Sequence, residues 1–227
     1  PAIPTYAHYD ASDAANVTAV TNNVVTALAD ISSNSYNADV GGNAPGAVLY
    51  PDAIQSATGL NLLDMGDTRN TLRTLLPSEQ DALLDFTPST GLAAGNSGFS
   101  FFAVARVDAL LDGVVRDIVL GNAGNEDAGL VLKFQGGFPE LHVGGVKAED
   151  TSVLPVAGDT LVLAANYDSA SGALEFWNSK AGASVSVTVT AGNFSQGAAI
   201  FIGGSNNPDQ FMDGAIGEVK FYDRKLT

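Results

Sequence analysis

The apolar residues of the chain occur in short runs, many of them alternating with polar residues, and turn-forming residues separate the runs. Alternating and β-branched runs of this length are typical of β-strands. In the second half of the chain they predict strands at residues 99–107, 117–120, 129–134, 140–143, 160–167, 173–178, 184–189, 198–203 and 214–222. Evenly spaced short strands favour a two-sheet sandwich or jelly roll over strand–helix–strand units.

The segments between these runs have the chemistry of tight turns. Glycine adopts positive φ angles, and Asn, Asp and Ser side chains bond to their own backbone. Such residues fill segments 121–125, 135–137, 168–172 and 203–208. They predict that neighbouring strands are joined as hairpins.

The first half of the chain has a weaker pattern. It predicts strands at 5–9, 24–29, 36–40, 47–50 and 60–64, and short helical segments at 10–15 and 77–84. The second helical segment has Ser78 as its N-cap and Asp81 three residues later, close to a capping box. Because the five short strands of this half cannot bury two faces alone, we interpret residues 1–227 as a single domain.

Charge and cysteine content exclude several classes of protein. The 227 residues carry a formal net charge of −15, whereas nucleic-acid binding requires clustered basic groups that neutralise phosphates. With no cysteine, the chain has no disulfide and no thiolate metal site. Its apolar runs are far shorter than the roughly 20 residues of a membrane-spanning helix. Acidic chains without cysteine are common among secreted bacterial proteins, so we expect a secreted or cell-surface location.

Both ends of the chain carry motifs of a known family. Residues 211–226 combine an aromatic residue, Gly, Ile, an acid-Val pair, Tyr-Asp-Arg and Leu, and residues 9–13 read Tyr-Asp-Ala-Ser-Asp. Segments 161–168 and 172–178 match the central strand pair of the same family. The chain resembles the laminin-G-like domains of the concanavalin A-like lectin/glucanase superfamily, in particular its secreted bacterial members.

This resemblance implies a fold and a metal. The fold is an all-β, concanavalin A-like two-sheet jelly-roll sandwich with one or two short helices, whose terminal strands pair in one sheet. The resemblance also implies a structural Ca²⁺ held by Asp10, Asp30 and Asp213, since loop carboxylates suit this hard ion. Alternatively, Asp30 forms an Asx-turn and Asp213 begins a strand, each as a solvated turn acid.

Catalytic constellations are weak in the sequence. A glycosidase needs two carboxylates that flank the scissile bond, yet no predicted strand carries two acids at even spacing, and only a split pair of Glu175 and Glu218 is conceivable. A polysaccharide lyase needs an acid–base pair and a group that neutralises the uronate. Arg106, His142 and Tyr167 offer these groups only in isolation, so we assign no catalytic residue.

Sugar binding usually needs an aromatic platform beside amides, acids or arginine. Side chains two residues apart share one face of a strand, so Arg106, His142, Asn166 and Trp177 are our candidates for a ligand-binding groove. In the competing interpretation Trp177 belongs to the core and Arg106 is a buried partner of an acid. Strand parity alone does not decide between the two.

These observations favour a non-catalytic recognition module of a larger secreted or cell-surface bacterial protein. Its expected partner is a glycan or another extracellular ligand, with further domains of the same chain as neighbours. The alternatives are a polysaccharide lyase or glycosidase on the same scaffold, and a purely structural domain of an adhesin.

Overall fold

A computed structural model describes the chain at residues 5, 7–19, 25–35, 37–39, 54–56, 61–66, 72–74, 98–107, 117–121, 130–168, 170–189, 201–203, 212, 214–222 and 224–227. Within these residues the fold is all-β, with a single short 3₁₀ helix, η1 (Ala14–Asn16). None of the described helices is long and apolar enough to cross a membrane. The predicted strand 47–50 and the predicted helix 77–84 lie outside the described residues.

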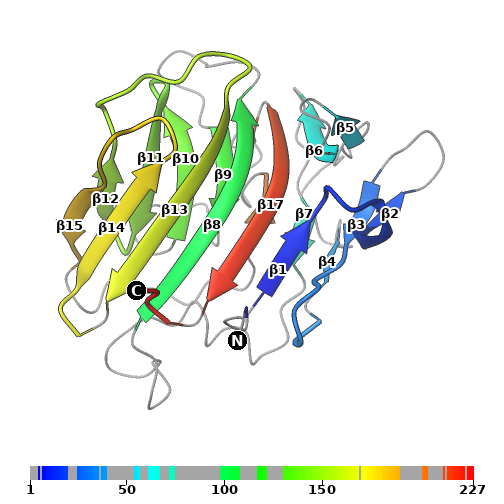
Figure 1. The fold of residues 1–227 in the computed structure, drawn as a ribbon, viewed down its shortest axis with the longest axis horizontal. Helices are drawn as coiled ribbons and strands as arrows, with labels where there is room; N and C mark the ends of the chain where they lie inside the picture. The colour runs from blue at the N-terminus through cyan, green and yellow to red at the C-terminus, as the bar shows by residue number, and fades with distance from the viewer. Residues whose placement is uncertain are drawn as a thin grey trace.

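The strands form two sheets that face each other, which confirms the predicted sandwich (Figure 1). The front sheet has the order β15-β14-β13-β8-β17-β6-β5, with β1 also paired to β17. Its strands are β15 (Val185–Thr188), β14 (Ala173–Asn178), β13 (Thr160–Asp168), β8 (Gly98–Val107), β17 (Gly214–Tyr222), β6 (Asn61–Gly66), β5 (Ile54–Ser56) and β1 (Ala7–Asp10).

The back sheet has the order β12-β11-β10-β9-β16-β7-β4-β3-β2. Its strands are β12 (Val146–Glu149), β11 (Phe138–Val143), β10 (Leu130–Gln135), β9 (Asp117–Gly121), β16 (Phe201–Ile202), β7 (Leu72–Thr74), β4 (Ala38–Asp39), β3 (Val25–Leu28) and β2 (Val17–Ala19). All pairings in both sheets are antiparallel.

The two terminal strands pair as the family resemblance implied. Ala7 is the register partner of Phe221, and Asp10 is the partner of Glu218. A helical segment was predicted at residues 10–15, and the structure has only the three-residue helix η1 there. The side chain of Asp13 caps this turn, accepting a hydrogen bond from the Ala15 amide at 2.9 Å.

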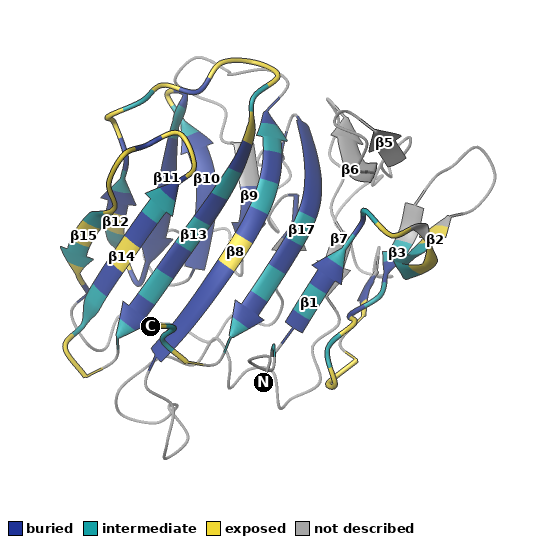
Figure 2. Cartoon of the chain, in the orientation of Figure 1, coloured by how far each residue is buried: buried dark blue, intermediate teal, exposed yellow. Residues whose placement is uncertain are grey.

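Alternation along the central front-sheet strands separates core from surface (Figure 2). In β8, Phe101, Ala103 and Ala105 are fully buried, whereas Phe102 is 36% exposed. The inward side chains meet those of the back sheet in one hydrophobic cluster, in which Phe99 packs on Tyr167 with ring centroids 5.3 Å apart. This period of two is what one buried and one exposed sheet face requires.

Strand β12 is an element that the sequence pattern did not predict. It follows β11 through a two-residue turn at Gly144 and Gly145, whose φ angles are +54° and +79°. Positive φ at both turn residues is the geometry of tight hairpins, and glycine adopts it readily. The short strands β2, β5 and β7 were also unpredicted.

Candidate functional site

A row of side chains crosses the outer face of the front sheet at right angles to the strands. Ala164 in β13 is the register partner of Trp177 in β14 on one side and of Phe102 in β8 on the other. The two aromatic residues therefore lie two strand spacings apart, about 10 Å. Because the methyl group of Ala164 is small, the surface between the two rings is hollow.

This hollow has a volume of about 100 Å³, and we call it the front-sheet hollow. Its described lining residues are Phe102, Ala164, Ala165, Asn166, Glu175, Trp177 and Ser184. Trp177 is half-buried, and Glu175 and Ser184 are exposed. A volume well below the roughly 300 Å³ of an enclosing ligand pocket makes the hollow an open contact surface for part of a larger ligand.

The second row across the face holds the polar groups. Asn166 is the register partner of both Glu175 and Ser100. Its Oδ1 accepts a hydrogen bond from the Ser100 hydroxyl, and its Nδ2 donates to the Leu226 carbonyl at 3.3 Å. The carboxamide of Asn166 is thus held in one orientation at the edge of the hollow.

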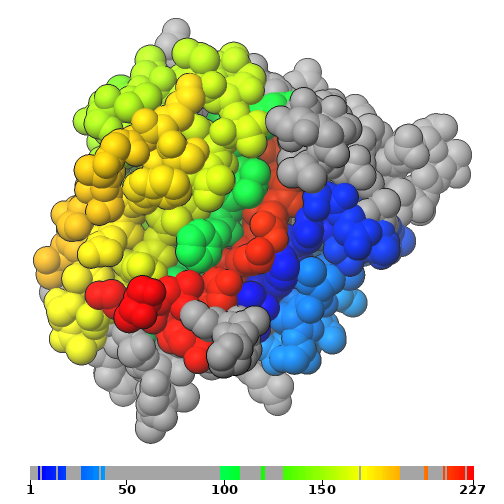
Figure 3. Space-filling model, in the orientation of Figure 1, coloured from blue at the N-terminus to red at the C-terminus, as the bar shows by residue number. Residues whose placement is uncertain are grey.

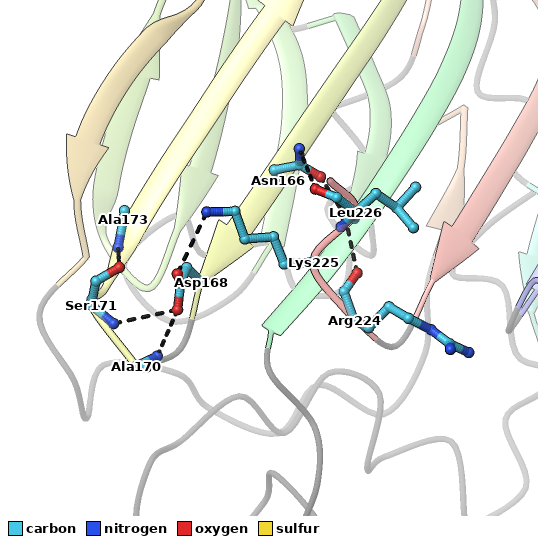
Figure 4. A network of polar contacts seen from close by, with 9 residues as sticks. Asn166, Asp168, Ala170, Ser171, Ala173, Arg224, Lys225 and Leu226 are labelled. Atoms are coloured by element: carbon cyan, nitrogen blue, oxygen red, sulfur yellow. Dashed lines mark hydrogen bonds and ion pairs between the residues drawn. The ribbon is translucent and has the colours of Figure 1, made fainter. Parts of the chain in front are cut away.

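Residues 224–227, which we call the C-terminal tail, lie over the ends of β8 and β13 (Figures 3 and 4). Ser100 Oγ accepts from the Leu226 amide at 2.9 Å, and the Arg224 carbonyl oxygen, 3.0 Å away, is a second acceptor within reach of the one hydroxyl proton. Lys225 Nζ lies 3.5 Å from Asp168 Oδ2. Hydrogen bonds from the backbone amides after Asp168, together with the Lys225 charge, hold the pKa of that carboxyl below its ordinary value. The C-terminal tail therefore contacts Asn166 and Ser100 at one edge of the front-sheet hollow.

The structure brings together two of the four predicted ligand-binding residues. Asn166 and Trp177 line the front-sheet hollow. Arg106 lies on the same outer face, half-buried, but is not among the described lining residues. His142 lies in β11 of the back sheet and cannot share a groove with the other three. The interpretation of Trp177 as core is wrong, because Phe176 takes the inward position of β14.

His142 belongs to a buried charged cluster on the back sheet. Its Nε2 lies 2.9 Å from Glu140 Oε2, and Lys133 Nζ lies 3.5 Å from the same oxygen. Lys147 Nζ lies 3.5 Å from the other carboxylate oxygen. Lys133 is fully buried and Glu140 is 3% exposed. Burial alone would raise the pKa of Glu140, but the His142 hydrogen bond and the two lysine charges outweigh it and lower the pKa to about 2.

Five lining residues of the hollow were not among the predicted ligand-binding residues: Phe102, Ala164, Ala165, Glu175 and Ser184. Parity placed Phe102 on the face of Arg106, and Glu175 on that of Trp177. Only the register of β8, β13 and β14 shows that these faces are one surface. Ser184 is the first residue of the predicted strand 184–189 and lies directly before β15 in the structure.

The predicted catalytic groups are not assembled. Glu175 and Glu218 lie in β14 and β17, three strand spacings apart in the front sheet, or about 14 Å. The two carboxyl groups of a glycosidase lie within about 10 Å. The lyase candidates are also dispersed, since Tyr167 is a core residue whose pKa burial raises, while His142 lies on the back sheet.

The carboxylates of Asp10 and Asp30 accept hydrogen bonds from different donors. Asp10 Oδ1 accepts from the amide and the hydroxyl of Ser12 at 2.9 and 2.6 Å. Asp30 Oδ1 accepts from the amides of His8 and Ser32 at 2.8 and 2.9 Å, and Oδ2 accepts from the Ser32 hydroxyl at 2.7 Å. Asp30 forms the Asx-turn of the alternative interpretation, but it is buried and not solvated. Asp10 forms the same kind of local turn bond. Asp213 lies outside the described residues.

In the described part of the chain, His8, Asp10 and Glu218 form a group that could hold a metal ion, because one potential ligand atom of each lies within 4.8 Å of the others. Asp30 does not belong to this group. His8 Nε2 and Lys220 Nζ lie 2.8 and 2.6 Å from Glu218 Oε1. A cation at this position would have to displace Lys220 from the carboxylate.

Calcium binding stays a prediction, and thermal unfolding tests it. An ion that binds only the folded chain stabilises it by about 2.7 kcal/mol at a hundredfold excess over Kd. For a chain of this length that corresponds to a rise in Tm of roughly 5–10 °C. Mg²⁺ at equal ionic strength is the control, because any divalent salt screens the net charge of −15. An equal rise with both ions contradicts a calcium site.

Comparison with known proteins shows the fold alone. No family model and no curated protein sequence matches the chain. Trypanosoma rangeli sialidase in complex with the inhibitor DANA matches with a TM-score of 0.61 at 12% identity, over 100% of this chain and 32% of that chain. A structure described as "Trypanosoma rangeli sialidase" matches with a TM-score of 0.60 at 14% identity, over 100% of this chain and 32% of that chain.

A third solved structure, of a different protein, has a similar fold. It is described as "Cell entry of botulinum neurotoxin type C is dependent upon interaction with two ganglioside molecules", and matches with a TM-score of 0.58 at 11% identity, over 93% of this chain and 47% of that chain. The chain therefore spans about a third of the sialidase chains and about half of the toxin chain. At these identities the finding is a shared β-sandwich fold.

Proposed function

We propose that the chain is a non-catalytic glycan-recognition domain of the laminin-G-like, concanavalin A-like type. In this proposal the glycan binds at the front-sheet hollow, and the domain is part of a larger secreted or cell-surface bacterial protein. The observation that carries the proposal is the pair of outward aromatic rings, Trp177 and Phe102, on either side of the hollow. Aromatic faces pack on the apolar faces of sugar rings, and the adjacent polar side chains bond to sugar hydroxyls.

Two observations support this proposal over a purely structural domain. Phe102 is exposed and Trp177 is half-buried on the same sheet face. Two large apolar side chains around one hollow are unusual on a face that contacts only water. In addition, the fold neighbours include a sialidase and a toxin whose description names gangliosides, which supports a glycan as the general class of ligand. The groups singled out for the lyase or glycosidase alternative, Glu175 with Glu218 and His142 with Tyr167, are dispersed in the described part of the structure.

Substitution of Trp177 by alanine tests the proposal. We expect the affinity for a bound oligosaccharide to fall at least tenfold, since aromatic anchors dominate binding energies. The free energy of unfolding should change by only about 1 kcal/mol, because Trp177 lies outside the core. A glycan array identifies the ligand, isothermal titration gives the affinity and urea denaturation gives the stability.

Phe176 provides the matched control. It is adjacent in β14 and fully buried, so Phe176→Ala should lower the free energy of unfolding by about 3–5 kcal/mol. Any folded Phe176→Ala protein should bind as the wild type does. Unchanged glycan affinity in Trp177→Ala, or no glycan bound by the wild type on the array, contradicts the proposed function.

A further inference from the structure

We infer that the front-sheet hollow selects neutral glycans and rejects acidic ones such as sialosides and uronates. This inference rests on the proposed function and adds the chemical class of the ligand. It follows from the kinds of hydrogen-bonding groups at the hollow and from the pairing of the cations around it.

Glu175 is the one charged side chain among the described residues that line the hollow. It is exposed and lies two residues from Trp177 on the same strand face, so its carboxylate stands beside the aromatic platform. An ionised carboxylate only accepts hydrogen bonds, and its two oxygens together accept two or more. Neighbouring hydroxyl groups of a neutral sugar are matching donors.

The hollow offers few donors for an anionic sugar. Asn166 Nδ2 carries two N–H groups, of which one is used by the Leu226 carbonyl. The remaining N–H, the exposed hydroxyl of Ser184 and the indole N–H of Trp177 are the side-chain donors among the described lining residues. A sugar carboxylate usually needs a cation or a bidentate set of donors to replace its water. Three single neutral donors on three separate side chains provide neither a cation nor the paired donors of one planar group.

The cations near the hollow on the same sheet face are already paired. Lys220, the register partner of Phe102, lies 2.6 Å from Glu218. Lys225 of the C-terminal tail lies 3.5 Å from Asp168. Arg106 also has an interaction within the chain. An acidic sugar would therefore meet the charge of Glu175, while the cations described around the hollow are engaged within the chain, in a protein whose net charge is −15.

The experiment compares matched neutral and acidic probes. The wild-type chain is titrated with galacto-oligosaccharides and oligogalacturonates, and with lactose and sialyllactose, while the fluorescence of its single tryptophan is followed. We expect a neutral probe to bind at least tenfold more tightly than its acidic partner. In Glu175→Gln, the affinity for the neutral probe should fall about tenfold, because a charge-assisted bond becomes a neutral one. The ratio of the affinity for the neutral probe to the affinity for the acidic probe should therefore decrease.

Glu149→Gln is the control, since it removes the same charge from the back sheet and should leave both affinities unchanged. Acidic probes that bind as tightly as the neutral ones, with binding lost in Trp177→Ala, would overturn the selectivity and leave the proposed function standing. Unchanged affinities in Glu175→Gln would also overturn it. Binding of neither class to the wild type would remove the proposed function, and the inference with it.

Discussion

Replacement of Glu140 by glutamine is expected to lower the free energy of unfolding by about 3–5 kcal/mol, the usual result of breaking a buried ion pair. Glu140 is 3% exposed, and its carboxylate lies 3.5 Å from the fully buried ammonium of Lys133. Glutamine keeps the size of the side chain but leaves that buried charge without a counterion. Urea denaturation at neutral pH measures the loss.

Glu149 supplies the control for this substitution. It is the register partner of Glu140 in β12, and its side chain is 26% exposed. Its contact with Lys147 is open to solvent, so Glu149→Gln should change the free energy of unfolding by less than about 1 kcal/mol. Equal losses in the two variants would mean that the buried pair contributes nothing beyond its surface neighbour.

The same carboxylate predicts a pH dependence. The pKa of Glu140 falls from its ordinary value of 4.5 to about 2 in the folded chain. Its stabilising contribution is therefore complete above pH 4.5 and is lost as the pH falls towards 2. The wild type should lose about 3 kcal/mol more than Glu140→Gln over this interval. Urea denaturation of both proteins between pH 2 and 7 compares them, and parallel curves would contradict the assignment.

The strands of the sandwich core were predictable because each depends on a local pattern. Burial on one face and exposure on the other impose a period of two, and segments 160–167, 173–178 and 214–222 carry it clearly. Strand β12 escaped prediction because it has only four residues, Val-Lys-Ala-Glu, whose two charged side chains obscure the pattern. Its position is specified by the preceding glycine turn more than by its own residues.

The candidate site was only half predictable because sheet membership is not local. Parity placed Trp177 and Glu175 on one face of their strand, and Asn166 on one face of its strand. That these faces are one surface, while His142 lies in the other sheet, follows from the strand order β14-β13-β8. This order is set by long-range pairing, which no single segment encodes.

The buried charged cluster of the back sheet was also not predictable from any single segment. Lys133 lies in a strand, Leu-Val-Leu-Lys-Phe-Gln, whose side chains are buried on both faces except for Gln135. The sequence shows a charge in an apolar strand. The partner appears only when β10 and β11 pair with Lys133 opposite Glu140. Buried charges of opposite sign in register are a feature of the assembled sheet.

We expect Gly98→Ala to lower the free energy of unfolding by more than about 3 kcal/mol, because β8 and β13 approach each other closely at this residue. Gly98 has a φ of +134°, and a Cβ atom built on it would lie 1.8 Å from the Tyr167 carbonyl oxygen. Backbone strain and overpacking each cost about 1–3 kcal/mol. Here the clashing atom is backbone in the neighbouring strand, so β8 and β13 would have to separate at this end.

Gly182→Ala is the matched control, because a Cβ at that position meets nothing within 4 Å, and its effect should stay within about 0.5 kcal/mol. Ser100 and Asn166, which hold the C-terminal tail beside the hollow, lie two residues from Gly98 and from Asp168, its register partner. Separation of the strands should therefore weaken glycan binding as well as stability. Equal unfolding free energies of Gly98→Ala and Gly182→Ala would show that β8 and β13 tolerate a wider spacing at this end.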